Sequence, residues 1–204
     1  MSEEQTLGLR ERKKRDTRRA LSDAALQLAF ERGLERVTRE DIAARAGVSV
    51  RTFTNYFTGK FDALAYRQTE RIRRSVACLR ARPADEPLWT AVSAALLEPL
   101  EADGAAETTP TPAQLAEIRT LLTVPELHFA IAKEAAEDWA EVIAARTGTD
   151  PHRDLYPRLV AGVIAAVGEA TMVAYAHADP PVPITTVLRS ALSDIAAGLP
   201  DPPR

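Results

Sequence analysis

The sequence predicts an all-α protein of about nine helices, with a small basic N-terminal unit joined to a larger acidic helical domain. Apolar residues recur at helical spacing along most of the 204 residues, and no alternating β-branched run is long enough for a sheet. Residues 1–82 hold 19 Lys and Arg against 11 Asp and Glu, a net charge of +8. Residues 83–204 hold 7 against 18, a net charge of −11. This asymmetry indicates that the basic unit binds a polyanion.

The basic unit begins with a predicted flexible arm over residues 1–15, which is polar and ends in a run of Lys and Arg. A helix is predicted over 16–32, and Gly33 is placed to end it in a left-handed conformation. Two short helices over 39–46 and 50–56 and a long helix over 60–81 follow. Residues 16–82 are therefore interpreted as one domain.

The acidic unit begins after residue 82, because Pro83 and Pro87 end the long helix. Asp150 and Pro151 are predicted to open a helix as its N-cap and first residue, and residues 102–112 form a loop. The predicted helices of this second domain, 83–204, are 87–101, 112–123, 125–147, 151–177 and 184–199.

Several classes of protein are excluded by missing signals. The single cysteine, Cys78, cannot form an internal disulfide, and the sequence shows neither a signal peptide nor an apolar run of ~20 residues. These features predict a cytoplasmic protein without a membrane segment. His128, His152 and His177 are too far apart for a metal site, and there is neither a phosphate-binding glycine loop nor a nucleophile motif. No metal, no cofactor and no enzymatic activity are predicted.

The segment Thr38–Phe57 predicts a helix-turn-helix. Thr38 and Asp41 have the spacing of a capping box, with Asp in place of the usual Glu. Gly47 can take the positive φ of a tight turn, and Ser49 can cap the next helix through its hydroxyl. The second helix of such a motif enters the major groove of DNA by its N-terminal end.

The side chains of the second helix suit base recognition. Phe53 and Phe57, four residues apart, anchor the helix inward. Arg can donate to guanine, Asn can read adenine, and Thr or Val can contact a thymine methyl group, while Tyr56 and Lys60 can reach phosphates. The predicted DNA-binding residues are Thr38, Arg39, Ser49, Val50, Arg51, Thr52, Thr54, Asn55, Tyr56 and Lys60.

The segment ALQLAFERGLERVTREDIAARAGVSVRTFTNYFTGKFDAL resembles the N-terminal domain of TetR-type repressors over about residues 17–65. The resemblance implies that Thr38 and Arg39 meet the DNA backbone, that Arg51 and Thr52 meet bases, and that Tyr56 and Lys60 meet phosphates. Thr54 departs from the family pattern, which commonly has an aromatic residue there. Gly59 and Phe61 also depart from it, which puts the cap of the following helix in doubt.

The resemblance implies that the acidic domain forms a homodimer and binds a small-molecule effector. The last two predicted helices carry wide apolar stripes, and pairing them with a twofold mate would give a four-helix bundle. The alternative is that both stripes fill the core of one protomer. The stripe residues are Leu155, Leu159, Gly162, Val163, Ala166, Ala170 and Val173 on 151–177, and Ile184, Val187, Leu188, Ala191, Leu192, Ile195 and Leu199 on 184–199.

The effector site is predicted from large side chains of the acidic domain, for which simple core packing is the alternative. The segment LLTVPELHFAIAKEAAEDWAEVIAARTG, residues 121–148, and the long Ala-rich helix that follows it resemble an actinobacterial TetR subgroup associated with acyl-CoA or other lipid-like ligands. This resemblance implies that Arg119, His128 or Lys133 meets an anionic head group. The net acidity of this domain argues weakly against a strongly anionic effector. The predicted pocket residues are Trp89, Arg119, His128, Phe129, Trp139, Met172 and Tyr175.

The sequence thus favours a ligand-responsive repressor that binds a palindromic operator as a dimer. An activator has the same sequence features. Two other classes remain open from the residues alone: a helical enzyme with an incidental basic end, and an adaptor that uses the basic end on an acidic protein.

Overall fold

The computed structural model describes residues 8–201, apart from the side chains of residues 9, 129–130 and 132–135. Within that range the chain forms nine α-helices and a 3-10 helix, and no strand, which confirms the predicted all-α class. The elements are α1 (Leu9–Arg32), η2 (Leu34–Arg36), α2 (Arg39–Arg45), α3 (Val50–Tyr56), α4 (Lys60–Ala81), α5 (Leu88–Ala102), α6 (Pro112–Leu121), α7 (Pro125–Thr147), α8 (Leu155–Ala176) and α9 (Ile184–Ala196).

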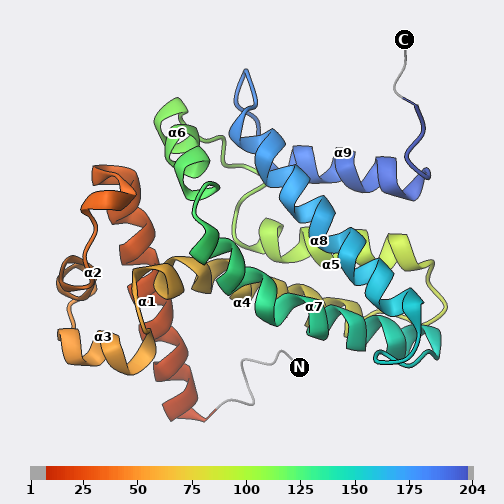
Figure 1. The fold of residues 1–204 in the computed structure, drawn as a ribbon, viewed down its shortest axis with the longest axis horizontal. Helices are drawn as coiled ribbons and strands as arrows, with labels where there is room; N and C mark the ends of the chain where they lie inside the picture. Colours follow the sequence, from red (N-terminus) through yellow and green to blue (C-terminus); the bar gives the residue numbers. More distant parts are fainter. Residues whose placement is uncertain (1–7, 202–204) are drawn as a thin grey trace.

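The molecule has two regions that share α4 (Figure 1). The head consists of α1 to α3 and the first turns of α4, and α2 and α3 lie at the left end of the molecule in this view. The body consists of the remainder of α4 with α5 to α9. Because α4 packs against α1 in the head and against α5 and α7 in the body, it is the helix through which the two regions are joined.

Each region is built around its own buried apolar residues. In the head, the cluster includes Leu21 and Leu28 of α1, Ile42 of α2, Phe53 of α3 and Leu64 of α4. This cluster also contains Leu121, from the end of α6, and Leu127, from the start of α7, so the body packs against the head at this point.

The body has two clusters. One lies between α4, α5, α7 and α8 and contains the buried side chains of Trp139 and Ile143. The other joins α5, α8 and α9 through Leu97, Val167 and Leu188. The paired helices of the body are thus held by side chains far apart in the sequence.

Most predicted helix limits agree with the structure, and three match at both ends: 50–56, 60–81 and 125–147. The flexible arm over 1–15 was wrong for its second half, because α1 begins at Leu9. Its Lys and Arg residues are good helix formers, so the helix extends through them in spite of their charge. Residues 1–7 of the arm lie outside the described residues.

The start of α8 also differs from the prediction, which placed it at 151 with Asp150 as the N-cap. Asp150 does cap a turn, since its Oδ1 accepts hydrogen bonds from the backbone N–H groups of His152 (2.8 Å) and Arg153 (3.1 Å). The helix begins only at Leu155, after Asp154, whose Oδ2 accepts from the Asp150 N–H at 2.8 Å. A proline after an Asx residue opens a turn as readily as a helix, so the local pattern could not separate the two.

Among the described helices, α8 is long and apolar enough to cross a membrane when judged by length and composition alone, with a mean hydropathy of 1.8. Core helices of globular proteins pass the same test. Only 33% of its most apolar window is buried within the protomer. The helix therefore presents apolar surface that its own chain does not cover.

Candidate nucleic-acid interface

Local hydrogen bonds at both helix starts form the α2–turn–α3 unit. The capping box is present: the Asp41 N–H donates to Thr38 Oγ1 (3.1 Å) and the Thr38 N–H donates to Asp41 Oδ2 (3.2 Å). Gly47 makes the turn at φ 69°, a conformation that side chains disfavour. Ser49 Oγ accepts the Thr52 N–H at 3.0 Å and caps α3. The predicted helix-turn-helix is therefore present.

Aromatic side chains hold α3 against the head. Phe53 is fully buried and Phe57 is nearly so. The ring centroids of Phe53 and Phe57 are 5.9 Å apart, and those of Phe57 and Tyr66 are 5.7 Å apart in an edge-on arrangement. Such contacts add stability beyond the burial of area alone. They leave the opposite face of the seven-residue α3 open.

That open face carries the predicted base-reading residues. Arg51, Thr54 and Asn55 are exposed, as is the capping Ser49. The Thr54 hydroxyl donates to the Arg51 carbonyl at 3.0 Å, so its hydrogen is already used within the helix. Thr38 and Arg39 are exposed at the start of α2, while Val50, Thr52 and Tyr56 are half-buried along the edges of α3.

Two of the predicted backbone-contacting cations have partners within the head. Arg39 pairs with Glu40 at 2.9 Å, and both side chains are exposed. Lys60 donates to the Leu34 carbonyl at 3.0 Å and lies over the Phe61 ring, 5.5 Å from its centroid. Since an ammonium has three hydrogens, this bond leaves donors for a phosphate.

The start of α4 has a cap that the sequence left in doubt. Gly59 provides no side-chain acceptor there. Instead the Asp62 carboxylate receives hydrogen bonds from the Thr58 backbone N–H, at 3.1 Å, and from the Thr58 hydroxyl. The turn between α3 and α4 is thus held from within α4.

Charged pairs also fix the position of α2 on α1. The Arg45 guanidinium meets Glu31 with two bonds, of 2.9 Å and 2.6 Å. The hydrogen bonds from Arg45 lower the pKa of Glu31, so the pair persists in its charged form at neutral pH. This bidentate geometry holds the two helices in one orientation.

Further cations lie on the start of α1, at the same side of the molecule as α2 and α3 (Figure 1). Arg10, Arg12, Lys13 and Lys14 are exposed there. They lie within helix α1, whereas the sequence predicted a flexible arm.

The predicted effector residues fall into two separate groups in the body. Trp139 is buried, and half-buried Trp89 packs against the same cluster and also borders a surface hollow between α5 and α9. Arg119 belongs to the other group, because its guanidinium donates to the carbonyl of Ala176 at 2.6 Å, and Ala176 ends α8, the helix that carries half-buried Met172 and Tyr175.

The remaining predicted effector residues lie on α7. His128 is exposed, and the side chains of Phe129 and Lys133 lie outside the described residues. The pairing of Arg119 with a helix-end carbonyl gives it a structural role that sequence alone did not suggest. Burial raises the pKa of Tyr175, so this phenol stays neutral at physiological pH.

One group of charged residues was missed altogether. Arg71 and Arg74 of α4 meet Asp103, the residue that follows α5. The available signal was the row Arg67, Arg71 and Arg74, whose spacing of four and three residues places all three on one side of a helix.

Comparison with known proteins agrees with this geometry. Residues 21–64 match the family described as bacterial regulatory proteins, tetR family, and residues 86–200 match the MftR C-terminal domain of TetR proteins. The chain is 34% identical over 166 residues to the HTH-type transcriptional regulator TcmR of Streptomyces glaucescens, which covers 79% of this chain and 74% of that protein.

Solved structures share the fold. One is the fatty acid degradation regulator FadR from Bacillus halodurans, at 22% identity and TM-score 0.58, covering 91% of this chain and 97% of that one. Another is Thermus thermophilus FadR, solved in complex with lauroyl-CoA, at 21% identity and TM-score 0.54, covering 92% and 97%. With the capped α2–turn–α3 unit and the two family matches, these likenesses lead to one conclusion: the chain is a DNA-binding transcription regulator that belongs to the TetR family, which is not a family of enzymes.

Proposed function

We propose that this regulator is a ligand-responsive repressor that binds a palindromic operator as a homodimer in the cytoplasm. The observation that supports this most directly is the open face of α3, where Arg51 and Asn55 are exposed beside a capped helix start. In a twofold dimer, two such helices would enter successive major grooves, roughly 34–36 Å apart.

The proposed contacts are of two kinds: those that specify the base sequence, and those that position the protein on the DNA backbone. Arg51 donates to guanine O6 and N7, and Asn55 reads adenine. The remaining proposed contacts go to thymine methyl groups or to the backbone, and backbone contacts supply most of the affinity and its salt dependence. They come from Thr38, Arg39, Ser49, Val50, Thr52, Thr54, Tyr56 and Lys60.

The proposed dimer forms mainly through α8. Most of the exposed large apolar side chains of the described residues lie on this helix: Leu155, Tyr156, Leu159 and Val173. Exposed Gly162 lies among them and allows close helix approach. We propose that this apolar face of α8 is covered by a second copy of the chain, because a palindromic operator is read by two protomers related by a twofold axis. On α9, by contrast, Leu188 and Leu192 are buried within the protomer.

We also propose that residues 16–82 read DNA and residues 83–204 dimerise and bind the effector. The two family matches leave 65–85 between them, which is most of α4 and the first part of the loop that follows. The effector proposed is acyl-CoA or a similar lipid-like molecule, and lauroyl-CoA, which the Thermus regulator binds in its solved structure, is the first probe.

Selection of bound sequences from random duplexes tests the DNA part. The selected sequence is expected to be a palindrome. The Arg51→Ala variant should bind this palindrome with about 1–3 kcal/mol less binding free energy, and should lose the base preference at one position of each half-site. Arg80→Ala is the matched control, because Arg80 is exposed at the body end of α4. Equal binding by both variants, or no preference for any duplex, would exclude the proposed reading. Tight binding to an acidic protein in place of DNA would support an adaptor instead.

Replacement of Leu159 by Glu tests the dimer. Leu159 is 56% exposed in the protomer, so the variant should fold normally but leave a charge unpaired in the interface. Light scattering during size-exclusion chromatography should show a monomer. Phe30→Glu, at an apolar residue 38% exposed on α1, should remain dimeric. A Leu159→Glu dimer as stable as the wild type would rule out the α8 interface.

A further inference from the structure

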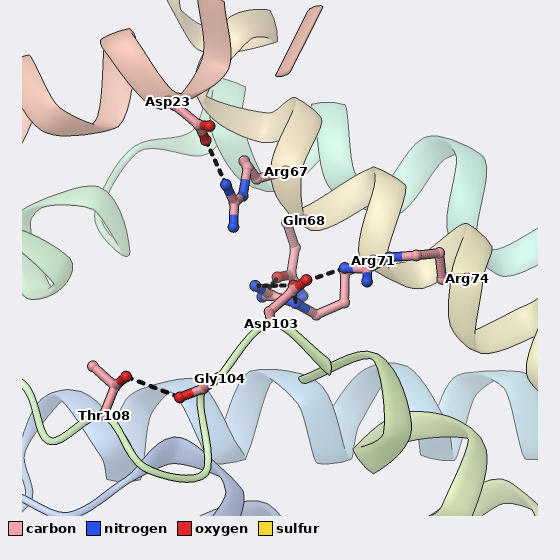
Figure 2. A network of polar contacts seen from close by, with 8 residues as sticks. All are labelled: Asp23, Arg67, Gln68, Arg71, Arg74, Asp103, Gly104 and Thr108. Atoms are coloured by element: carbon pink, nitrogen blue, oxygen red, sulfur yellow. Dashed lines mark hydrogen bonds and ion pairs between the residues drawn. The ribbon is translucent and has the colours of Figure 1, made fainter. Parts of the chain in front are cut away.

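The middle of α4 carries a row of arginines between the two regions. The helix contributes Leu64 and Tyr66 to the apolar cluster of the head and Val76 and Leu79 to that of the body. Arg67, Arg71 and Arg74 lie between these ends. Arg67 pairs with Asp23 of α1 at 2.5 Å, whereas Arg71 and Arg74 turn to the end of α5 (Figure 2).

Asp103 is the anion on which Arg71 and Arg74 converge (Figure 2). A single oxygen, Oδ2, accepts all three bonds: from Arg74 Nη2 at 2.7 Å, Arg71 Nη2 at 3.2 Å and Arg71 Nε at 3.3 Å. Arg71 Nη1 also donates to Gln68 Oε1 at 3.0 Å. The Asp103 side chain is 11% exposed and those of Arg71 and Arg74 are 22% and 31% exposed. The cluster is therefore largely withdrawn from water.

The cluster holds more positive than negative charge. Two guanidinium groups face one carboxylate, and the Gln68 amide is neutral. Asp103 stabilises the charged form of Arg71, whereas the neighbouring cations Arg67 and Arg74 repel it. Arg74 Nε is buried and has no hydrogen-bond partner in the described part of the chain. Burial lowers the pKa of Arg71, which means that the surroundings do not fully compensate its charge.

A group with more acceptor oxygens would complete this arrangement. Arginine forks bind carboxylate and phosphate with paired hydrogen bonds, and they do so most strongly where water is excluded. The single shared oxygen of Asp103 leaves most guanidinium hydrogens without an anionic acceptor.

We propose that Arg71 and Arg74 are the anion-binding end of the effector site, and that Asp103 occupies it until a carboxylate or phosphate group of the effector takes its place. This rests on the proposed ligand response. It replaces Arg119, His128 and Lys133 as the residues that would meet an anionic head group. It also overrides the expectation drawn from net acidity, because the local charge on α4 is positive.

Displacement of Asp103 would act directly on the link between head and body. Asp103 follows the last residue of α5, so its bonds to Arg71 and Arg74 tie the end of α5 to the middle of α4. The Arg67–Asp23 pair ties the same stretch of α4 to α1. An anion that displaces Asp103 breaks the bonds between α4 and α5 but leaves the Arg67–Asp23 pair between α4 and α1. Helix α4 can then shift together with the head, which changes the spacing of the two recognition helices.

The anion site is tested by titrating the full-length protein with inorganic phosphate and, separately, with acetate, at constant ionic strength. Binding is followed by the arginine Nε–Hε resonances in NMR spectra. The Asp103→Asn variant should bind at least one of the two anions at least tenfold more tightly than the wild type, because the internal competitor is gone. Arg74→Gln should abolish saturable binding. Arg74→Lys, which keeps the positive charge but has no guanidinium fork, should weaken anion binding.

Asp23→Asn is the matched control, since it removes the carboxylate from the neighbouring Arg67 and leaves the cluster intact. Its anion affinity should equal that of the wild type. If Asp103→Asn and Asp23→Asn behave alike, or Arg74→Gln binds as the wild type does, the cluster is a structural ion pair and the proposal is overturned. A preference for phosphate over acetate, or the reverse, identifies the head group.

Operator binding separates this proposal from the proposed function. Without effector, Asp103→Asn should bind the operator about 5–150-fold more weakly than the wild type, the usual range of coupling between sites. Unchanged operator affinity would overturn the coupling. A wild type that binds no operator would instead overturn the proposed function, and the anion titration would still decide the site.

Discussion

The helix-turn-helix of the head and the charged contacts of the body both lie on helices, yet they depend on contacts of different range. In the head, Thr38 bonds to Asp41 and Ser49 to Thr52, three residues apart in each case. In the body, Arg119 reaches Ala176 and Arg71 reaches Asp103, 57 and 32 residues away. The comparison teaches that the proposed DNA-reading surface is encoded locally, whereas the proposed anion site depends on which distant segments meet.

The largest expected effect comes from removing a large buried side chain from the apolar cluster of the head. Phe53→Ala should lower the free energy of unfolding by about 3–5 kcal/mol, because Phe53 is fully buried beside Phe57. Both tryptophans, Trp89 and Trp139, lie in the body, so fluorescence reports the body while circular dichroism reports the whole chain. In urea, the dichroism transition should precede the fluorescence transition.

The control for this separation is Ile143→Ala, at a fully buried residue of the body. It should lower the free energy of unfolding of the body, which the fluorescence transition reports, by about 2–5 kcal/mol. Coincident transitions in the Phe53→Ala variant would show that head and body unfold as one unit, and would break the division between them.

The next effect concerns the charged start of α1. Changing Arg10, Arg12, Lys13 and Lys14 to Gln keeps good helix formers in place. Operator affinity at low salt should fall by about tenfold or more, and the salt dependence should become shallower by about 0.9 for each phosphate that is no longer neutralised. Filter binding between 50 and 200 mM salt measures both.

Arg80→Gln with Arg153→Gln is the control for that experiment, because both arginines are exposed in the body. Their removal should leave the salt slope unchanged. A slope that falls equally in both variants would show that general charge, and not the position of α1, attracts the DNA.

A smaller effect compares two helix caps of the same kind. Ser49 caps α3 in the head and Thr111 caps α6 in the body, each through its side-chain oxygen. Either change to Ala should cost about 0.5–2 kcal/mol of stability. Only Ser49→Ala should also weaken operator binding, as measured by fluorescence anisotropy, because the start of α3 is proposed to enter the groove. Equal operator affinity in the two variants would count against this orientation.

The smallest effect is expected at Cys78, in the body part of α4. Burial and the hydrogen bond to Glu98 raise the pKa of this thiol to about 11. At pH 8 the thiol is protonated, so iodoacetamide should react slowly in the native protein and faster as the pH rises towards 11. Mass spectrometry follows the reaction. Labelling at pH 8 at the rate of the urea-unfolded chain would show that α4 and α5 open freely.

The sequence went furthest where structure depends on neighbours in the chain. The limits of α3, α4 and α7 were all predictable, because caps, glycines and apolar spacing act within one or two turns. It failed at Leu9, where charge was mistaken for disorder, and at Asp150, whose cap serves a turn that precedes α8.

Periodicity shows that a helix has an apolar side but does not show which helix will cover it. Most of the apolar stripe on α9 packs against α5 and α8 within the protomer, whereas Leu155 and Leu159 on α8 are exposed. No rule of residue spacing distinguishes these two outcomes. The same holds for Arg71 and Asp103, whose attraction depends on a distance that only the packed chain sets.

The sequence by itself therefore determined the helical class, the helix-turn-helix and the exposed face of α3, since these follow from contacts between residues a few positions apart. The tertiary structure decided that Arg119 holds the end of α8 and that Arg71 and Arg74 share Asp103. Packing brings together residues far apart in the chain, and the partner and burial of a charge decide what it can bind.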